Sequence, residues 1–423
     1  MNSTNPNRPR ILSIVGCLLV QLCVGIIYLW SVFKTPVAES FGCAAETLNM
    51  VSSFMLSAFV VGCMLGGFMN DRSGPRLTCI TGVGLLSAGM LLTGFLTPST
   101  IVAINFTYAV LGGLGSGIAY SACVSCVQKW LPHKRGLATG LAVSAFGLST
   151  VVFAPAFKAL MAAYTVTETG LVDFQRVFFA LAVIFLSCGL IGCFMIRTPN
   201  QASETNVKAA APNADIPLGK AVRTMPFWCI FLTVFFINGT WNLTVPVLYD
   251  LGIERGLTAA AATFAVSFTG IPNAIGRLLM ASLSDKMGRR NCIRLLSILT
   301  AVAALLMIFA KGYAYIAVVA VIAFAYGGPS SVNAAMTTDY FGSRHSGTNY
   351  GVIMLALGLS SLFFNMLSAT VLHGNLSLSF VTAAISAVIP LILMSAIGDP
   401  PAIIQEDTHT GRHGRHRPIH HGV

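Results

Sequence analysis

Residues 70–76 read Asn-Asp-Arg-Ser-Gly-Pro-Arg, and residues 284–290 read Ser-Asp-Lys-Met-Gly-Arg-Arg. Both contain Asp-(Arg/Lys)-x-Gly-x-Arg, and the two copies are offset by 214 residues. A second pair of polar stretches, 130–136 and 340–347, repeats at nearly the same period, with Arg135 and Arg344 lying 209 residues apart. Two separate repeats at one period indicate that the chain consists of two related halves.

Each copy of the motif suits a tight connection between two helices. Gly74 and Gly288 permit a sharp turn, while Asp71 and Asp285 are placed to pair with basic side chains and neighbouring helix ends. We expect a gating cluster that holds one side of the protein shut and breaks when that side opens. The alternative is a set of charges that only keeps these loops on one side of a membrane. The cluster comprises Asp71, Arg72, Gly74, Arg76, Asp285, Lys286, Gly288, Arg290, Arg135 and Arg344.

The composition around these motifs is that of a membrane protein. The 423 residues are 55% hydrophobic and only 9% charged, whereas a soluble domain is about 25% charged. This argues against a soluble enzyme, a disordered regulator or a nucleic-acid-binding protein. A spanning helix needs about 20 mostly apolar residues. The sequence predicts twelve such spans, at 11–33, 48–69, 77–97, 101–128, 137–162, 174–196, 226–249, 259–284, 291–310, 313–337, 348–371 and 376–397.

The predicted fold is therefore an all-α polytopic membrane protein made of two pseudo-symmetric bundles of six transmembrane helices. The expected divisions are an N-terminal tail (1–10), a first bundle (11–196), a polar inter-bundle loop (197–225), a second bundle (226–397) and a His/Arg-rich tail (398–423).

Basic residues predict the orientation. If both termini face the cytoplasm, nineteen Lys and Arg residues lie on that side and four lie outside. This is a strong positive-inside bias, and it explains the net charge of +11 without a polyanionic partner. We expect a multi-pass protein of the plasma membrane, of the bacterial inner-membrane type, with both termini cytoplasmic.

The eleven cysteines do not form an evident metal or redox motif. Nearly all lie in or beside apolar runs, where Cys behaves as a small hydrophobe. Cys123-x-x-Cys126 lies inside an apolar segment with no second ligand pair. No metal, no cofactor, no nucleotide and no nucleic acid are expected, and no catalytic arrangement that would indicate an enzyme.

Several stretches together resemble the major facilitator superfamily and, within it, the oxalate:formate antiporter family, a relative of the monocarboxylate transporters. They are residues 28–33 (Tyr-Leu-Trp-Ser-Val-Phe) with Pro36-Val37, residues 129–140 (Lys-Trp-Leu-Pro-His-Lys-Arg-Gly-Leu-Ala-Thr-Gly), Arg277 followed by residues 284–289, and Tyr326-Gly327-Gly328. The resemblance covers about 11–397. It implies the twelve-span fold, a monomer and transport of small organic anions.

Arg277 is the charge that requires an explanation. It precedes Asp285 by eight residues, about 12 Å along a helix. A charge within the membrane costs at least ~2.5 kcal/mol. By inspection no acidic residue lies mid-span, so an anion from solution is the natural partner of this guanidinium, which matches a carboxylate in two hydrogen bonds. The alternative is snorkelling or pairing at a helix end. The resemblance agrees with substrate binding, because a span-eight arginine binds substrate carboxylate in these families.

Two departures from the resembled families bear on mechanism. Proton-coupled monocarboxylate transporters carry Asp four residues before this arginine, where this chain has Asn273, and an amide cannot carry a proton. Oxalate transporters carry a lysine in span eleven at a position that corresponds to Leu357. One cation suits one carboxylate, so monocarboxylates are favoured over oxalate, unless Lys158 or Lys34 compensates.

Aromatic and polar residues within spans complete the candidate site. Tyr28, Trp30, Tyr120 and Tyr326 match aromatic positions of the family and can wall a small site, although interfacial or packing roles remain open. Asn238, Asn242 and Gln21 are polar within spans and serve either a cavity or an interhelical hydrogen bond.

The predicted function is a secondary active transporter for small carboxylates of the formate, pyruvate, lactate or oxalate class. It is expected to work by alternating access, through anion exchange or uniport. Proton-coupled symport and a transporter-like sensor are the alternatives.

Overall fold

The computed structural model describes residues 7–26, 30–44, 48, 50–167, 170–198, 215–372 and 375–398. In these ranges the regular structure is helical, apart from one antiparallel bridge between Thr165 and Val172. The all-α prediction is confirmed.

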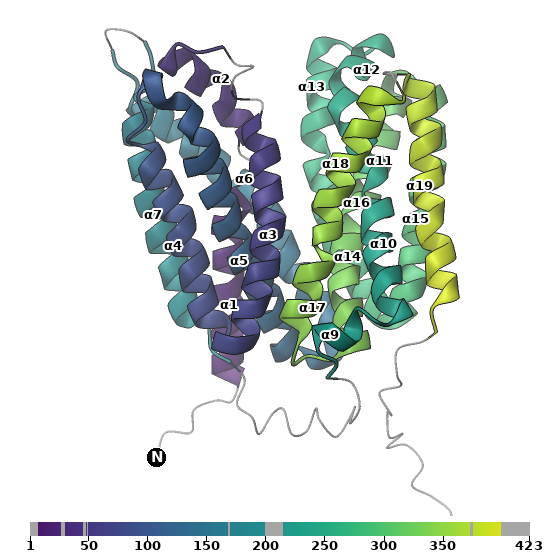
Figure 1. Ribbon diagram of the computed structural model, residues 1–423. Coiled ribbons are helices and arrows are strands. Elements are labelled where there is room, and N and C mark those ends of the chain that lie inside the picture. The colour runs from purple at the N-terminus through teal and green to yellow at the C-terminus, as the bar shows by residue number, and fades with distance from the viewer. Residues whose placement is uncertain are drawn as a thin grey trace, which may run out of the picture.

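The first half contributes one group of helices, drawn in purple to blue (Figure 1). Its elements are α1 (Asn7–Val24), α2 (Trp30–Phe41), α3 (Met50–Ser73), α4 (Pro75–Thr93), η3 (Pro98–Ala103), η4 (Asn105–Leu111), α5 (Gly112–Trp130), η5 (Pro132–Lys134), α6 (Arg135–Ala163) and α7 (Phe174–Met195).

The second half forms the neighbouring bundle, drawn in teal to yellow (Figure 1). Its elements are α9 (Leu218–Ala221), α10 (Met225–Ile237), α11 (Gly239–Thr244), η6 (Val245–Val247), α12 (Leu248–Glu254), α13 (Ala259–Phe268), α14 (Gly270–Met287), α15 (Arg289–Phe309), α16 (Gly312–Phe341), α17 (Ser346–Ile353), α18 (Leu355–Thr370) and α19 (Leu376–Ala396).

Eleven helical segments of the described chain are long and apolar enough to cross a membrane. They fall on the second to twelfth predicted spans. The first predicted span falls on α1 and α2, and residues 27–29 between these helices lie outside the described ranges. The structure has the twelve-helix architecture that the sequence predicts.

The predicted inter-bundle loop and tails are only partly described. Helix α1 begins at Asn7, inside the predicted tail, and α9 lies inside the predicted loop. Residues 1–6, 199–214 and 399–423 lie outside the described ranges, so the predicted division of the chain at these segments stays a prediction.

Several helices are broken within their spans, and the breaks follow the sequence. The seventh span is divided at Asn238 and again near Pro246, into α10, α11, η6 and α12. The eighth is interrupted at Thr269, three residues before Pro272. Proline has no N–H to donate to the carbonyl four residues earlier, so Pro246 and Pro272 interrupt the helical hydrogen bonds just before them, whereas no proline adjoins the break at Asn238. From the sequence alone, both spans are predicted to be continuous.

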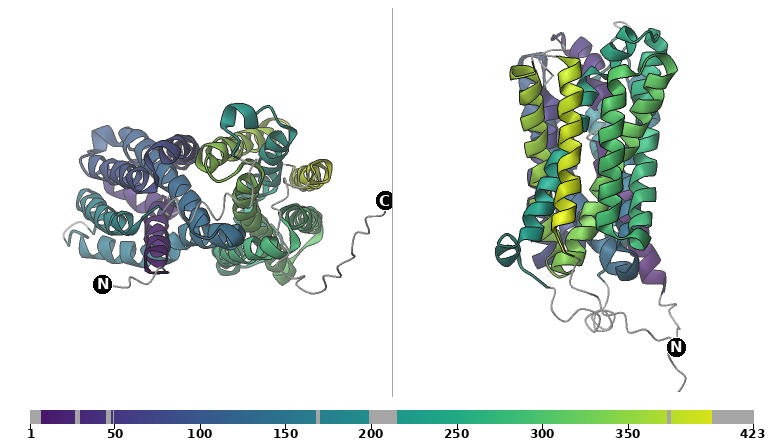
Figure 2. Two further views of the ribbon diagram at one scale, coloured as in Figure 1. Left: turned by 90° about the horizontal axis from the view of Figure 1, so that it is seen from below. Right: turned by 90° about the vertical axis from the view of Figure 1, so that its right-hand side faces the viewer.

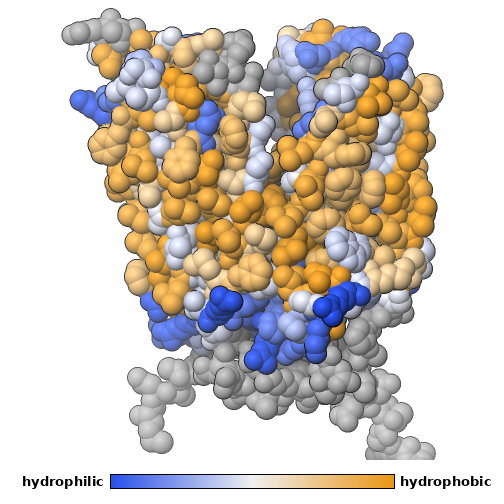
Figure 3. Space-filling model, viewed as in Figure 1, coloured by the Kyte–Doolittle hydropathy of each residue, from blue (hydrophilic) through white to orange (hydrophobic). Residues whose placement is uncertain are grey.

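Apolar side chains cover most of the outer surface of the helices, as expected of a protein that lies in lipid. Figure 3 shows a broad apolar belt with hydrophilic residues at both ends, most prominently at the lower end. Helix α1 begins and α19 ends at this lower end, which we call the terminal end (Figure 1). Seen from below, the two bundles lie side by side (Figure 2).

The two bundles meet closely near the terminal end through glycines. A Cβ on Gly67 of α3 would lie 2.1 Å from the carbonyl oxygen of Gly347, and one on Gly136 of α6 would lie 2.0 Å from that of Ala281 on α14. Glycine alone permits this backbone-to-backbone approach. Toward the opposite end the surface is hollowed between the bundles (Figure 3).

Candidate functional site

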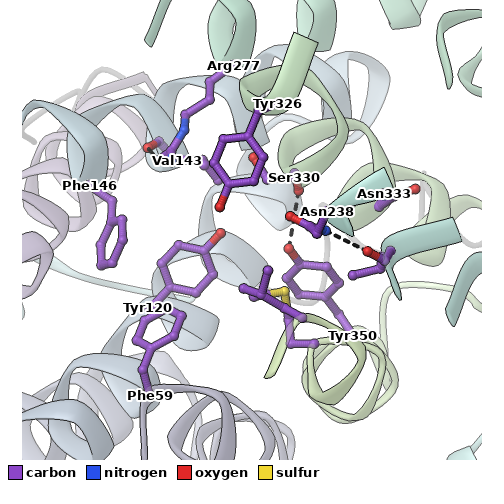
Figure 4. Close-up of a pocket in the computed structure, with 13 residues that line it drawn as sticks. Phe59, Tyr120, Val143, Phe146, Asn238, Arg277, Tyr326, Ser330, Asn333 and Tyr350 are labelled. Carbon is purple, nitrogen blue, oxygen red and sulfur yellow. Dashed lines mark hydrogen bonds between the residues drawn. The ribbon is translucent and has the colours of Figure 1, made fainter. Parts of the chain in front are cut away.

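A pocket lies between the bundles, with walls supplied by both (Figure 4). The empty space among its side chains is about 550 Å³, counting the part open to solvent. Its lining residues are Phe59, Tyr120, Val143, Phe146, Val234, Asn238, Arg277, Tyr326, Ser330, Asn333, Tyr350, Met354 and Leu357.

The wall from the first bundle is aromatic. Tyr120 of α5 packs edge-on against Phe59 of α3 at 5.3 Å and against Phe146 of α6 at 5.0 Å between ring centroids. Edge-to-face packing holds each ring in a defined orientation. This wall is therefore apolar, with one phenolic hydroxyl.

The wall from the second bundle combines aromatic and polar groups. The ring of Tyr326 on α16 stacks on Trp241 of α11 at 4.3 Å with planes 7° apart. Tyr350 of α17 donates from its hydroxyl to the Ser330 carbonyl at 3.2 Å. These contacts join the short helices α11 and α17 to α16 at the points where the spans are broken.

Arg277 of α14 supplies the positive charge of the pocket. Its side chain is 6% exposed, and Nη1 donates across the bundle interface to the Val143 carbonyl of α6 at 3.0 Å. Room for the guanidinium exists because position 147 is glycine, where a Cβ would lie 3.1 Å from Nη1. No acidic side chain belongs to the lining set. A guanidinium in an apolar, aromatic pocket has the geometry to hold a planar carboxylate.

Some of the other residues predicted for the pocket line it and others do not. Tyr120 and Tyr326 line the pocket, as does Asn238. Trp30 lies elsewhere, with its indole 2% exposed and packed on Tyr108 at 5.2 Å. Asn273 is half-buried one helical turn before Arg277 and is not among the lining residues, and Tyr28 lies outside the described ranges.

The structure also places four further residues that the sequence singled out. Leu357 lines the pocket, so a residue there does reach the site. Lys158 is exposed, and neither it nor Lys34 lines the pocket. Asn242 donates to Ser360 at 3.2 Å. Of the two roles that the sequence allows for this residue, lining a cavity or bonding between helices, this contact is the interhelical hydrogen bond.

The motif aspartates hold helix N-termini of the opposite bundle at the terminal end. Asp71 accepts from the backbone N–H of Thr348 at 2.8 Å, at the start of α17. Asp285 accepts from the N–H groups of Gly136 and Leu137, both at 2.9 Å, at the start of α6. An anion is favoured where a helix begins because the first N–H groups have no partner within the helix. The repeat in sequence is thus a repeat of one contact.

Sequence reasoning missed two members of the second contact. Asp339 accepts from Arg135 across the interface at 2.9 Å, and Arg289 lies between the two aspartates, 2.9 Å from Asp339 and 2.6 Å from Asp285. Asp339 was overlooked because the tenth span was predicted to end at 337, whereas α16 continues to Phe341. An acidic residue at the end of an otherwise apolar span was the available signal.

The remaining motif residues have local positions. Gly74 and Gly288 have φ of 79° and 86°, which favour glycine and allow the turns. Arg76 packs over the Phe194 ring at 5.0 Å, and Arg290 donates to the Met394 carbonyl at 3.2 Å. The side chains of Arg72, Lys286 and Arg344 are exposed.

We predict that Asp339→Asn loosens the closed terminal end. The change removes the carboxylate shared by Arg135 and Arg289, and hydrogen bonds to charged groups contribute about 1.5–3 kcal/mol each. Spin labels at the exposed positions 72 and 286 should therefore show a larger population of long distances. Asp173→Asn, which breaks a pair with Arg176 outside this cluster, is the control. An unchanged distance distribution would contradict the prediction.

Among the described residues no group of His, Cys, Asp and Glu has the geometry of a metal site.

Comparison with known proteins gives a consistent result. The model of the Major Facilitator Superfamily matches residues 14–365 and 230–415. The oxalate:formate antiporter of Oxalobacter formigenes is 26% identical over 391 residues, covering 91% of this chain and 90% of that protein. Monocarboxylate transporter 13 of Rattus norvegicus is 25% identical over 371 residues, covering 86% of this chain and 82% of that one. The solved structure of the transporter FucP in its outward conformation covers 92% of this chain and 99% of its own, with a TM-score of 0.70 and 14% identity, which shows the shared fold.

Proposed function

Because the chain belongs to the major facilitator superfamily, we propose that it is a secondary transporter that exchanges small monocarboxylate anions across the membrane by alternating access. Its relatives and its fold are those of transporters, not of enzymes.

The observation that carries the proposal is the place of Arg277. Its guanidinium is buried in a pocket that both bundles line, and it contacts the opposite bundle through Val143. An anion held there touches both halves at once, which is what a carrier that rocks its halves around a central site requires.

The lining also supports a substrate with a single carboxylate. Arg277 is the one cationic residue among the thirteen that line the pocket, and Leu357 presents an apolar side chain. A second carboxylate would lose its hydration there without gaining a charged partner, and this costs several kcal/mol in an apolar environment.

The positive charge of Arg277 favours exchange of one anion for another over net transport. When the pocket is empty, closing the bundles over Arg277 removes water from a guanidinium at a large free-energy cost. A bound carboxylate neutralises that charge and lowers the barrier, so the loaded carrier changes conformation faster than the empty one. Proton-coupled symport is the second candidate, although no carboxylate lines the pocket to carry the proton.

The positive-inside bias supports a cytoplasmic terminal end in a plasma membrane, of the bacterial inner-membrane type. The contacts of Asp71, Asp285 and Asp339 then close the cytoplasmic side, and the described conformation faces outward. We propose that these contacts break and reform once per cycle. The proposed functional unit is a monomer, because one chain contains the whole pocket.

Counterflow into proteoliposomes tests the function. Vesicles are loaded with unlabelled formate, pyruvate, lactate or oxalate, and entry of the labelled anion is followed with and without an inward proton gradient. We expect entry that requires internal anion and is insensitive to the gradient. Entry driven by the proton gradient would establish symport instead, and entry at the same rate into empty vesicles would establish uniport. No entry of any carboxylate would refute the proposal.

A further inference from the structure

One side of the pocket carries an amide that the function proposed above does not use. Asn333 of α16 lines the pocket, is 2% exposed, and follows the lining residues Tyr326 and Ser330 at helical spacing on one face. Within the described ranges its carboxamide oxygen has no hydrogen-bond partner. A buried carbonyl oxygen without a partner is rare in proteins and calls for an explanation.

The surroundings narrow what can satisfy this oxygen. Asn238, its neighbour in the lining, donates to the Val234 carbonyl at 2.6 Å, and Tyr350 donates to the Ser330 carbonyl at 3.2 Å. The hydroxyl of Tyr350 is therefore engaged with backbone, and Asn238 uses one of its two amide N–H groups in the same way. Since a carbonyl oxygen only accepts, an occupant of the pocket that bonds to Asn333 must donate.

The charge of the lining selects the kind of donor. An ammonium group would be buried without a carboxylate to compensate it, because no acidic side chain lines the pocket. A hydroxyl donates without adding charge. The amide therefore suits a neutral alcohol group.

The two sides of the pocket also indicate that the ligand carries two different groups. Figure 4 shows Arg277 and Asn333 on different sides, with Tyr326, Ser330 and Asn238 between them. Formate has no second polar group, and the second group of oxalate is an anion that donates no hydrogen bond.

We propose that Asn333 is a substrate-binding residue that accepts a hydrogen bond from a hydroxyl group, and that the substrates are hydroxy-monocarboxylates. This rests on the proposed carboxylate transport, with Arg277 binding the anionic end and Asn333 selecting the polar group at the other.

The test compares each hydroxy acid with its deoxy counterpart in competition for exchange. The pairs are 2-hydroxypropanoate with propanoate, and 3-hydroxybutanoate and 4-hydroxybutanoate each with butanoate. 2-Oxopropanoate and alanine serve as probes that carry a carbonyl or an ammonium in place of the hydroxyl. We expect at least one hydroxy acid to be preferred by about tenfold, since a site that holds an unpaired polar group rejects the analogue that cannot bond to it.

Substitutions of Asn333 test whether this residue causes the preference for the hydroxy acid. In Asn333→Leu the hydroxy-to-deoxy ratio should fall to about one, through loss of the hydroxy acid and not of the deoxy acid. Asn333→Ser keeps a small hydrogen-bonding side chain and should retain part of the ratio. Asn365→Leu, the same change at an exposed position of α18, should leave it unchanged.

The possible outcomes distinguish a failure of the proposed role of Asn333 from a failure of the proposed carboxylate transport. Exchange of carboxylates with equal rates for each pair in the wild type, or the same ratio in Asn333→Leu, would overturn the role of Asn333 and leave carboxylate transport standing. Preference for 2-oxopropanoate or alanine over every hydroxy acid would also overturn it. If no carboxylate is exchanged, the proposed function itself fails.

Discussion

Arg277→Gln is expected to reduce carboxylate exchange by about a hundredfold or more. The guanidinium can offer a carboxylate two charge-assisted hydrogen bonds, and bonds of that kind contribute about 1.5–3 kcal/mol each. Losing both at the lower value corresponds to about a hundredfold in affinity. Glutamine keeps much of the length and polarity but supplies no charge to neutralise the anion. The measurement is the initial rate of counterflow in proteoliposomes.

Two further variants show that the loss belongs to this position. Arg277→Lys keeps the charge without the planar fork, and should retain more exchange than glutamine while binding substrate less tightly than arginine. Lys158→Gln neutralises the other basic residue predicted within a span, which is exposed on α6, and should exchange at the wild-type rate. Near-normal exchange by Arg277→Gln would return this arginine to a structural role, with its bond to Val143 as its purpose.

Gly136→Val is expected to hold the protein with its terminal end open and to slow transport at least tenfold. A Cβ at this position would lie 2.0 Å from the Ala281 carbonyl oxygen of the opposite bundle. Both atoms belong to or adjoin the backbone, so no side-chain rotation relieves the overlap. Such overpacking costs about 1–3 kcal/mol, occasionally more, and tenfold corresponds to about 1.4 kcal/mol.

The internal repeat contains an equivalent glycine contact in which the same change can be made independently. Gly67→Val introduces the corresponding clash with the Gly347 carbonyl and should have the same effect, whereas Gly84→Val on α4 meets no atom within 4 Å and should be neutral. Distances between spin labels at positions 72 and 286 report the terminal end in each variant. A population of the closed state equal to that of the wild type would show that the bundles tolerate the extra methyl groups.

The sequence determined most of the fold. Apolar runs of about 20 residues can only be spanning helices, because backbone groups in lipid must bond within their own segment. The repeat of Asp71 and Asp285 implied two related halves, and the structure places both aspartates at equivalent helix N-termini. Arg277 stood out from sequence alone because a charge within a span is costly wherever it faces lipid.

Only the tertiary structure decided which residues meet. Trp30 and Tyr120 are both aromatic residues within predicted spans, yet only Tyr120 lines the pocket, because the rotation of each helix is set by its neighbours. Asp339 joins Arg135 and Arg289 from three helices, a convergence that no spacing along the chain encodes. The amide of Asn333 resembles any polar residue in a helix until packing places it in the pocket wall with its oxygen buried. Hydropathy and charge are properties of each segment of the chain, so spanning helices and their orientation can be predicted from the sequence. A binding site depends on side chains that packing brings together from distant segments.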